Sequence, residues 1–309
     1  MWKILKKVVL FLFLGIIIAL GVFFYLWQKT PVSQINFLIL GIAGGNHQGK
    51  DLTDTIMFAS LNPYQKQLAL VSLPRDIWLE KWRAKLNSIY HYKGLEETKK
   101  TVEEILGQKV DYGIIIDFEL FQKIIDALGG ITINVERSFD DYRYPIPGKE
   151  NDLCGGDPQY RCRYEHLHFE AGKQFMDGQT ALKFVRSRNA QGEEGTDFAR
   201  AARQQKVILA IKDKILSKEF LLSPKKVIQL FKLVSLNIQT DIPKEKYWQI
   251  AKMGIKIKNI KTVTLNENYL INPPISKKYD NQWVLIPKSG NWSEIQEYIK
   301  EFLMTNWPN

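Results

Sequence analysis

Residues 110–135 read VDYGIIIDFELFQKIIDALGGITINV. Val110–Ile116 has the character of a buried strand, and Phe118–Leu128 repeats apolar residues at helical spacing. The pair Gly129-Gly130 ends helices readily, because glycine adopts the left-handed conformation at low cost. Ile131–Val135 alternates with a period of two, as a strand with one buried face does. The stretch therefore predicts a strand–helix–strand unit, a building block of α/β folds.

The alternation of strands and helices continues on the N-terminal side of this stretch. Ile35–Leu40, Thr55–Leu61 and Leu68–Leu73 are short apolar runs that predict strands, and the NPYQKQ between the last two has turn chemistry. Ile89–Gln108 places apolar residues at helical spacing. Because the strands are apolar throughout rather than on one face, we expect an α/β fold with a central mixed sheet and helices on both faces.

The C-terminal side of the stretch predicts a more helical arrangement. A loop-rich segment from about Glu136 to Gly172 comes first. No internal repeat or low-complexity linker follows, so we expect one α/β domain over residues 35–305. The candidate helices are 177–186, 197–216, 223–235, 243–254 and 292–305, and the strand-like pieces are 260–266 and 282–287.

The N-terminus predicts a membrane anchor. Val8–Trp27 contains no charged side chain, and as a helix of ~1.5 Å per residue it would span ~30 Å, the hydrocarbon thickness of a bilayer. Three lysines precede the run and one follows it. We therefore expect residues 1–7 in the cytoplasm, 8–27 as a transmembrane helix, 28–34 as a stalk and the domain outside the cell membrane. A cleaved signal peptide is the alternative, which the long run and its bulky end disfavour.

The charge of the chain bears on its partners. The net charge is +10, but residues 1–29 hold four lysines and no acids, which leaves 39 basic against 33 acidic residues, or +6, in the rest. This mild excess suits an acidic substrate or an anionic surface. The charges do not gather in the single stripe that a nucleic-acid footprint needs, so we expect no nucleic-acid partner.

The two cysteines allow two interpretations. Cys154 and Cys162 enclose a seven-residue loop, and outside the cytoplasm such a local pair indicates a disulfide. His166 and His168 lie close by and would complete a four-ligand zinc site. The cysteine spacing is wider than zinc sites usually have, and thiols oxidise outside the cell, so the disulfide is favoured.

Two pairs of arginines are the strongest local signal of a binding site. Arg186 and Arg188 flank Ser187, so in an extended segment both side chains point the same way. Nine residues further on, a predicted helix begins with a second pair.

Asp197 is placed to cap that helix, and Arg200, Arg203 and Gln204 then share one face of its first two turns. Guanidinium groups bind phosphate in bidentate fashion, and the N-terminus of a helix adds to the attraction. A solvated basic helix face is the alternative, although such faces usually pair lysine with glutamate. The spacing therefore indicates an oxyanion site.

Carboxylates at the ends of predicted strands are a second signal. Asp51 and Asp54 close a glycine-rich loop after the first strand, and Asp76 follows the strand Leu68–Leu73. Loops at strand ends are where α/β sheets place ligands, and such carboxylates suit Mg²⁺ shared with substrate phosphates. Taken singly, each aspartate is more often a turn or capping residue. Lys85, a short way on, offers a further phosphate contact.

The sequence offers no convincing covalent nucleophile. It contains no Gly-x-Ser-x-Gly motif, and its four histidines lack a matching serine or cysteine motif. A metal ion with arginines and no protein nucleophile points to direct phosphoryl transfer, in which positioning and charge stabilisation dominate.

Several sequence blocks, taken in order, resemble the LytR–CpsA–Psr (LCP) family. They cover roughly residues 35–215 and are together far more specific than any single motif. The blocks are DTIMFASLNPYQKQLALVSLPRD, KLNSIYHYKG, VDYGIIIDF, IIDALGGITINV, GKQFMDGQTALKFVRSR and DFARAARQQKV.

The resemblance implies a membrane-anchored phosphotransferase that uses Mg²⁺. Such an enzyme moves a glycopolymer from a polyprenyl-pyrophosphate carrier to peptidoglycan or another cell-envelope acceptor, and a hydrophobic channel holds the lipid. Combined with the patterns above, it gives three sets of expected residues. They are Asp54, Arg75, Asp76, Arg188 and Arg200 for catalysis, Lys85, Arg186, Arg203 and Gln204 for substrate binding, and Asp54 and Asp51 for the metal.

The chain departs from the family at one position. Members usually carry an aspartate two residues after the glycine that ends the first strand, whereas this chain reads Gly41-Ile42-Ala43. Asp51 or His47, later in the same loop, are candidates to substitute. The departure keeps two other functions open, a polyprenyl-phosphate binding protein and a lipid-pyrophosphate hydrolase. A transcriptional role, the family's older label, is disfavoured because a domain outside the membrane cannot reach DNA.

One predicted helix is a candidate wall of the lipid channel. Phe118, Phe121, Ile124, Ile125 and Leu128 share its apolar face. Ordinary core packing produces the same periodicity and is the commoner reason for any one of these residues.

Overall fold

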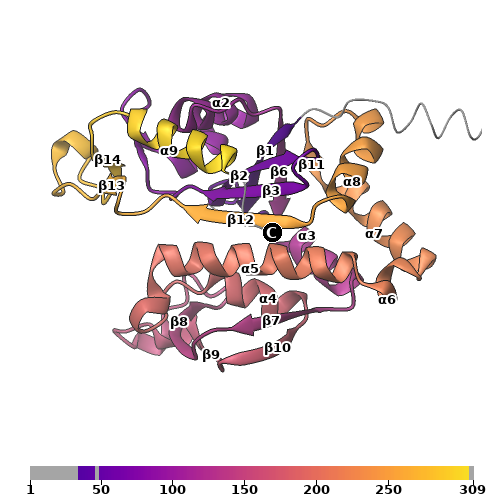
Figure 1. Cartoon of the computed structure of the whole chain (residues 1–309). Coiled ribbons are helices and arrows are strands. Elements are labelled where there is room, and N and C mark those ends of the chain that lie inside the picture. Colours follow the sequence, from indigo (N-terminus) through magenta and orange to yellow (C-terminus); the bar gives the residue numbers. More distant parts are fainter. Residues whose placement is uncertain (1–33, 46–48, 306–309) are drawn as a thin grey trace, which may run out of the picture. The chain divides into compact units, whose positions relative to one another are not determined.

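The structure is a computed structural model that describes residues 34–45 and 49–305. The expected cytoplasmic tail, the membrane helix at 8–27 and residues 28–33 of the stalk lie outside this part. Within it, no helix combines the length and apolarity needed to cross a bilayer. From Ile35 onward the chain forms one compact unit (Figure 1).

A six-stranded sheet forms the centre of this unit. Its order is β11-β6-β1-β2-β3-β12, with β1 parallel to β6, β3 parallel to β12 and the other neighbours antiparallel. The prediction of a central mixed sheet is therefore confirmed. The strands are β1 (Ile35–Ile42), β2 (Thr53–Asn62), β3 (Gln67–Ser72), β6 (Tyr112–Asp117), β11 (Gln239–Thr240) and β12 (Asn259–Thr264).

Helices α2 and α9 cover one face of the sheet (Figure 1). They span Ile89–Leu106 and Ser293–Met304. Leu38 of β1, Val102 of α2 and Ile299 of α9 are fully buried in one shared core. Burial of such side chains contributes about 1.5–3 kcal/mol each, which fixes this face as the main hydrophobic core.

On the opposite side lie α3 (Phe118–Ala127) and α4 (Gly178–Arg186), which pack closely together. A Cβ at Gly178 would lie 2.4 Å from the carbonyl oxygen of Gln122, so only glycine allows α4 to begin against the middle of α3. The close packing places α4 along α3, and the last residue of α4 stacks on the first residue of α3, as described below.

Helix α5 (Asp197–Ile215) connects the sheet to a second core. Buried Gln205 donates from Nε2 to Ser72 Oγ at 3.0 Å and to the Val263 carbonyl at 3.2 Å, which fastens α5 to β3 and β12. Val207 is buried instead in the core shared with α3 and α4. Helices therefore lie on both faces of the sheet, as the sequence predicts (Figure 1).

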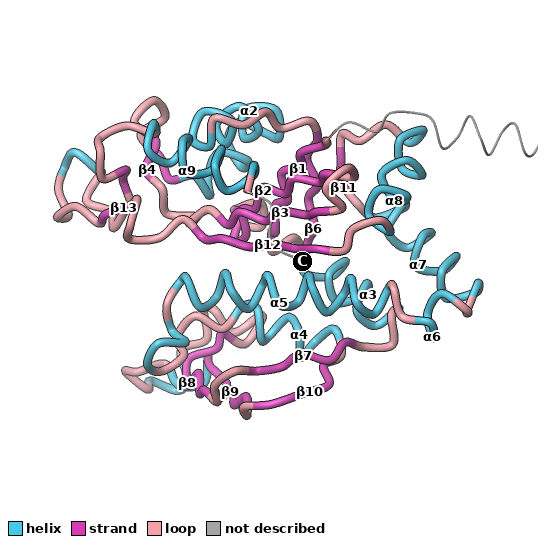
Figure 2. Tube along the Cα trace, viewed as in Figure 1, coloured by secondary structure: helices cyan, strands magenta, loops and turns pink. Residues whose placement is uncertain are grey.

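Two small antiparallel ribbons complete the second core (Figure 2). β7 (Ile131–Val135) pairs with β10 (Gly172–Met176), and β8 (Phe139–Pro145) pairs with β9 (Tyr164–Phe169). β7 alternates as predicted but lies outside the central sheet. The prediction of a loop-rich segment is wrong for β8 and β9, because polar side chains on their exposed face hide the apolar alternation.

The C-terminal third contains the predicted helices and several short elements. Of the strand expected at 282–287, Leu285 forms an isolated bridge with Ile77, and Ile286 and Pro287 pair with Ile271 and Leu270. The elements of the domain not yet named, from all parts of the chain, are α6 (Lys218–Leu221), α7 (Pro224–Asn237), α8 (Tyr247–Ile255), β4 (Trp78–Leu79), β5 (Ala84–Lys85), β13 (Leu270–Ile271), β14 (Ile286–Pro287) and 3-10 turns at Leu86–Ser88, Cys154–Gly156, Arg161–Arg163, Gly192–Gly195, Lys244–Lys246 and Lys277–Tyr279.

Candidate active site

A cavity of about 710 Å³ lies between the central sheet and helices α3, α4 and α5. One end is lined by charged side chains, and the rest of the wall is largely apolar. The apolar lining includes Ile39, Phe118, Phe121, Ile124, Ile208 and Ile211.

Helix α5 carries the change from polar to apolar along one face. Arg200, Gln204, Ile208 and Ile211 all line the cavity, at positions i, i+4, i+8 and i+11. That spacing keeps them on one side of a helix. Because Arg200 lies in the first turn, the helix N-terminus adds its positive dipole to the charged end.

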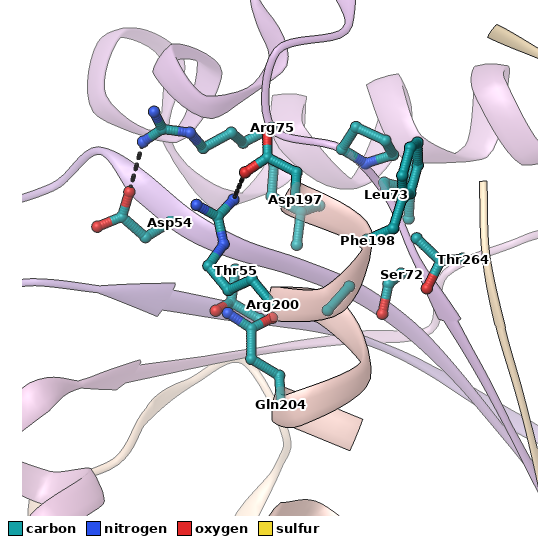
Figure 3. Close-up of a pocket in the computed structure, with 13 residues that line it drawn as sticks. Asp54, Thr55, Ser72, Leu73, Arg75, Asp197, Phe198, Arg200, Gln204 and Thr264 are labelled. Atoms are coloured by element: carbon teal, nitrogen blue, oxygen red, sulfur yellow. Dashed lines mark hydrogen bonds and ion pairs between the residues drawn. The ribbon is translucent and has the colours of Figure 1, made fainter. Parts of the chain in front are cut away.

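Four arginines from three parts of the chain meet at the charged end. Arg186, Arg188 and Arg200 line the cavity itself. Arg75, just after β3, lines an adjoining recess that also contains Arg200 and Gln204 (Figure 3). The sequence prediction that these five residues form one site therefore agrees with their placement.

Arg75 is held by a chain of ion pairs that begins on β2. Its Nη1 donates to Asp54 Oδ1 at 2.7 Å (Figure 3), and its Nε lies 3.4 Å from Asp76 Oδ2. Lys85 Nζ donates to the other oxygen of Asp76 at 2.7 Å. Asp76 is buried, and neither it nor Lys85 is among the residues that line the cavity or the recess. In this arrangement Asp76 and Lys85 orient Arg75 rather than face a ligand.

Arg200 is a buried cation whose hydrogen bonding is incomplete. Its Nη2 donates to Asp197 at 2.8 Å (Figure 3), but its Nη1 is buried with no hydrogen-bond partner in the described part of the chain. Burial lowers the pKa of Arg200 to about 10, and repulsion from Arg188 and Arg75 acts in the same direction. A buried donor without a partner is costly and rare, so the site is short of an acceptor, as an anion-binding site would be.

Arg188 shares this unfavourable environment. Burial lowers the pKa of its guanidinium, and the charge of Arg75 lowers it further. Buried Asp141 fixes its backbone, because Oδ2 accepts from Ser187 Oγ at 2.7 Å and from the Arg188 and Asn189 amides at 3.2 Å. The sequence does not reveal this positioning role of Asp141, since nothing in the run FDDYRYP distinguishes a buried carboxylate from a surface one.

Arg186 lies where the charged end meets the apolar wall. Its guanidinium carbon is 4.2 Å from the centre of the Phe118 ring, and its Nη1 is 3.3 Å from the Tyr144 hydroxyl. Burial raises the pKa of Tyr144, so this hydroxyl stays neutral. Arg186 ends α4 instead of lying in an extended segment, yet it and Arg188 both reach the cavity.

Arg203 has a different environment from the other arginines. Its side chain is buried and donates to the carbonyls of Phe184 and Ser187, at 3.0 and 2.6 Å, and to Glu194 at 2.8 Å. It is not among the residues that line the cavity. Its guanidinium therefore holds together the segment that carries Arg186 and Arg188.

The expected magnesium ligands are placed unequally. Asp54 lines the cavity beside the arginines, and its side chain is 36% exposed. Asp51 lines neither the cavity nor the recess, and its carboxylate lies 3.9 Å from His91. His47 lies outside the described residues. One accessible carboxylate beside a cluster of arginines fits Mg²⁺, which keeps several ligands for water and phosphate. Asp54 as the first ligand and Asp51 as the second both stay predictions.

The start of α5 corrects one expectation. Thr196, not Asp197, is the N-cap, and its hydroxyl accepts from the Ala199 amide at 3.1 Å. Thr196 has the extended backbone of a cap, whereas Asp197 is already helical. This shift by one residue leaves the Asp197 carboxylate available to pair with Arg200.

The cysteines form a disulfide, with their Cα atoms 5.5 Å apart. This confirms the favoured interpretation and excludes the zinc site that needed two thiolates. His166 and His168 both contact Asp140 instead, at 2.7 and 2.9 Å.

The helix expected to line a lipid channel, α3, divides its apolar residues between two roles. Phe118, Phe121 and Ile124 line the cavity. Ile125 and Leu128 are fully buried in the cores behind it. Part of the helix thus lines a cavity and part is ordinary core packing; that the cavity holds a lipid stays a prediction.

Comparisons with known proteins agree with this geometry. The model of the LytR_cpsA_psr family matches residues 27–301. The polyisoprenyl-teichoic acid–peptidoglycan teichoic acid transferase TagV of Bacillus subtilis (strain 168) is 25% identical over 285 residues, or 89% of this chain and 66% of TagV. TagU of Bacillus licheniformis, a transferase of the same description, is 29% identical over 205 residues, or 65% of this chain and 58% of TagU. The chain thus spans less than two thirds of the length of these curated relatives.

Solved structures share the fold. The crystal structure of B. subtilis TagV superposes with a TM-score of 0.64 at 24% identity, covering 89% of this chain and 98% of that one. Protein gbs0355 from Streptococcus agalactiae gives a TM-score of 0.65 at 24% identity, covering 88% of each chain. With the family model matched over nearly all of the described residues, this chain belongs to the LytR_cpsA_psr family.

Proposed function

We propose that this protein is a membrane-anchored phosphotransferase. It would move a glycopolymer with its phosphate from a polyprenyl-pyrophosphate carrier to a hydroxyl group of peptidoglycan or another cell-envelope acceptor. The observation that carries this proposal is the buried Nη1 of Arg200, which has no hydrogen-bond partner among the described residues and lies at the charged end of an apolar cavity. A lipid pyrophosphate matches both parts of this cavity, and the relatives TagV and TagU are named as transferases of a polyisoprenyl-linked polymer.

The arginines supply the chemistry that the transfer needs. The acceptor hydroxyl oxygen forms a bond to the glycan-linked phosphorus and releases its proton to water. The bond from that phosphorus to the bridging oxygen breaks, and polyprenyl phosphate leaves with the electron pair. Negative charge builds on the departing phosphate, and Arg75, Arg188 and Arg200 would stabilise it from fixed positions. These buried arginines repel one another. A bound anion relieves that repulsion, so the interaction free energy is more favourable than with solvated arginines.

Asp54 is the carboxylate that would hold Mg²⁺ together with the substrate phosphates. The ion, when bound, supplies further neutralisation of pyrophosphate charge. The 2.7 Å bond from Arg75 orients Asp54 toward the same space. Asp76, which is buried between Arg75 and Lys85, would act on the site only through Arg75.

The proposed location is the outer side of the cell membrane. The apolar run at residues 8–27 would span the bilayer with residues 1–7 in the cytoplasm. A disulfide between Cys154 and Cys162 supports the oxidising side for the domain, since such bonds rarely persist in a reducing cytosol.

The direct test uses the full chain in lipid nanodiscs with a lipid-pyrophosphate glycan, peptidoglycan and Mg²⁺. Arg188→Ala and Arg200→Ala should each reduce transfer by about 100-fold or more. Arg83→Ala is the matched control, because Arg83 pairs with Asp280 on the surface away from the cavity. If both cavity variants transfer at the wild-type rate, the proposal is wrong.

The same experiment separates two other functions that Ala43 keeps open. Release of polyprenyl phosphate and glycan phosphate without an acceptor product would identify a hydrolase. Tight retention of the lipid without any cleavage would identify a binding protein.

A further inference from the structure

Helix α7 is apolar on two sides. Its inner side packs against the domain, where Leu230 is buried with Leu128 and Phe220. Ile124 and Ile211, which line the cavity, also pack against this cluster. The apolar end of the cavity is therefore separated from α7 by a single layer of side chains.

The outer side of α7 exposes a second apolar surface. Val227, Ile228 and Phe231 lie at i, i+1 and i+4 and are 37%, 53% and 59% exposed. Leu221 and Leu222, at the end of α6, are 51% and 81% exposed. We call these five residues the α7 outer face. Contiguous exposed apolar side chains of this size usually mark an interaction site.

Lysines surround the α7 outer face. Residues 217–240 hold four lysines and one acid. The acid, Glu219, is already shared by Lys214 and Lys226. Within the residues that the structure describes, Lys225 and Lys232 have no carboxylate within ion-pair distance. An apolar helix face flanked by unpaired lysines matches the interfacial region of an anionic bilayer in both polarity and charge.

The position of α7 in the domain fits the same partner. β11 directly follows α7, and Lys246, soon after, donates to the Tyr112 hydroxyl at 2.5 Å. Tyr112 pairs with Phe37 near the start of β1. The helices α7 and α8 therefore lie at the end of the domain where the chain enters at Ile35 (Figure 1).

The sequence before Ile35 limits how far this end can lie from a membrane. The apolar run at residues 8–27 ends seven residues before β1. Seven residues at ~3.3–3.6 Å each reach at most ~25 Å. Ile35, at the start of β1, would therefore stay within that distance of the end of the apolar run.

We propose that the α7 outer face rests in the headgroup region of an anionic bilayer. The apolar end of the cavity, one layer of side chains from α7, would then lie next to the bilayer from which the polyprenyl chain comes. This inference rests on the proposed function for the identity of the lipid, but the docking itself requires no turnover. The occupant is the lipid surface rather than a second copy of the chain, because lysines on one copy would face lysines on the other.

The test measures depth in the membrane. The full chain, one per nanodisc, carries a nitroxide on Phe231→Cys or, as a matched control, on Ile275→Cys. Ile275 is 62% exposed in the loop between β13 and the turn at Lys277–Tyr279, at the other end of the domain (Figure 1). The native cysteines are joined as a disulfide and do not react with the label. Collision with oxygen and with a water-soluble nickel chelate reports the depth.

The readout is the ratio of the collision rate with oxygen to the collision rate with the chelate. In discs with anionic lipid, we expect this ratio to be at least about threefold higher for the label at position 231 than for the label at position 275. Adding Lys225→Glu and Lys232→Glu, or using purely zwitterionic lipid, should reduce this difference. Equal accessibility at the two positions would overturn the proposal. So would protection at 231 that appears only with two chains per disc, since that result identifies a second copy as the partner.

The outcome is independent of the transferase proposal. Depth is read without a substrate, so an inactive enzyme can still pass this test. Conversely, loss of transfer in Arg200→Ala with no protection at position 231 would support the proposed function and reject membrane docking by α7.

Discussion

Arg75 donates a 2.7 Å hydrogen bond from Nη1 to Oδ1 of Asp54, and this bond joins the loop after β3 to the start of β2. It leaves the Arg75 Nε buried without a hydrogen-bond partner in the described part of the chain, 3.4 Å from Asp76. The pair therefore places an oriented carboxylate and a guanidinium group beside the same space. That combination suits a magnesium pyrophosphate, which carries both charges.

Asp54→Asn should reduce transfer by about 100-fold, because it removes the carboxylate for the metal and the anchor of Arg75 together. Mg²⁺ titration of activity should show the same variant requiring a higher metal concentration. Asp280→Asn is the control, since Asp280 also accepts from an arginine but on the surface. Wild-type turnover in Asp54→Asn would remove Asp54 from the site.

Arg200 and Arg203 should respond to substitution in opposite ways. Arg203→Ala leaves the carbonyls of Phe184 and Ser187 and the Glu194 carboxylate without their donor. The free energy of unfolding should therefore fall by about 3 kcal/mol or more, and the Tm by at least about 5 °C. Arg200→Ala removes a buried cation that two neighbouring arginines repel, and should change stability by less than about 1 kcal/mol while activity is lost. Calorimetry beside the transfer assay separates the two.

Similar stability losses in both variants would contradict this division. Arg203→Lys is a useful second variant, because a lysine cannot reproduce the fork that bridges two carbonyls and a carboxylate. It should recover only part of the lost Tm.

The contrast between these two arginines also shows what the sequence could and could not predict. Spacing placed both on one helix face, and it correctly brought Arg186, Arg188, Arg200 and Gln204 to one cavity. Spacing could not predict which guanidinium would donate to backbone carbonyls. Arg203 does so because the tertiary fold brings the carbonyls of Phe184 and Glu194 within hydrogen-bond distance of it. The positioning role of Asp141 was equally hidden, since a carboxylate's burial depends on tertiary contacts.

The fold was predictable where strands are buried on both faces. β1, β2 and β3 appear within two residues of the expected bounds because nothing but an interior strand suits such apolar runs. β8 and β9 were missed because half of each strand faces water. The placement of β7 outside the central sheet depends on its pairing with β10, a partner that local pattern does not identify.

A polyanion should stabilise the protein through Arg200. Folding lowers the pKa of Arg200 from its ordinary value to about 10, so its cationic form is disfavoured in the fold. That penalty is fully present below pH 10 and disappears as the pH rises from about 10 to the ordinary pKa of arginine. At pH 7, bound inorganic pyrophosphate should offset it and raise the Tm in a concentration-dependent manner. Arg200→Ala should lose most of this increase, whereas Arg83→Ala should keep it.

His168 should titrate above its ordinary pKa of 6.5, because hydrogen bonds to Asp140 first and Glu170 second favour its charged form. A raised folded pKa means that the contact stabilises the β8–β9 ribbon below pH 6.5, and that this stabilisation is lost as the pH rises through the folded pKa. NMR titration of the ring protons measures the midpoint. Asp140→Asn should lower it more than Glu170→Gln does; the reverse order would contradict the assignment.

Filling the cavity should discriminate between long and short lipid carriers. Ile208 lies one turn beyond Gln204 on the face of α5 that lines the cavity and is only partly buried, so Ile208→Trp places its extra volume in the channel instead of the core. We expect kcat/KM for a full-length polyprenyl donor to fall about 10-fold or more. For a donor with a chain of a few carbons, kcat/KM should stay within about twofold of the wild-type value, because only the long chain reaches that depth of the cavity. Ile275→Trp controls for the added ring on an exposed loop. An equal loss for both donors would show that the substitution disturbs the arginines, and no loss for either would show that the lipid does not occupy the cavity.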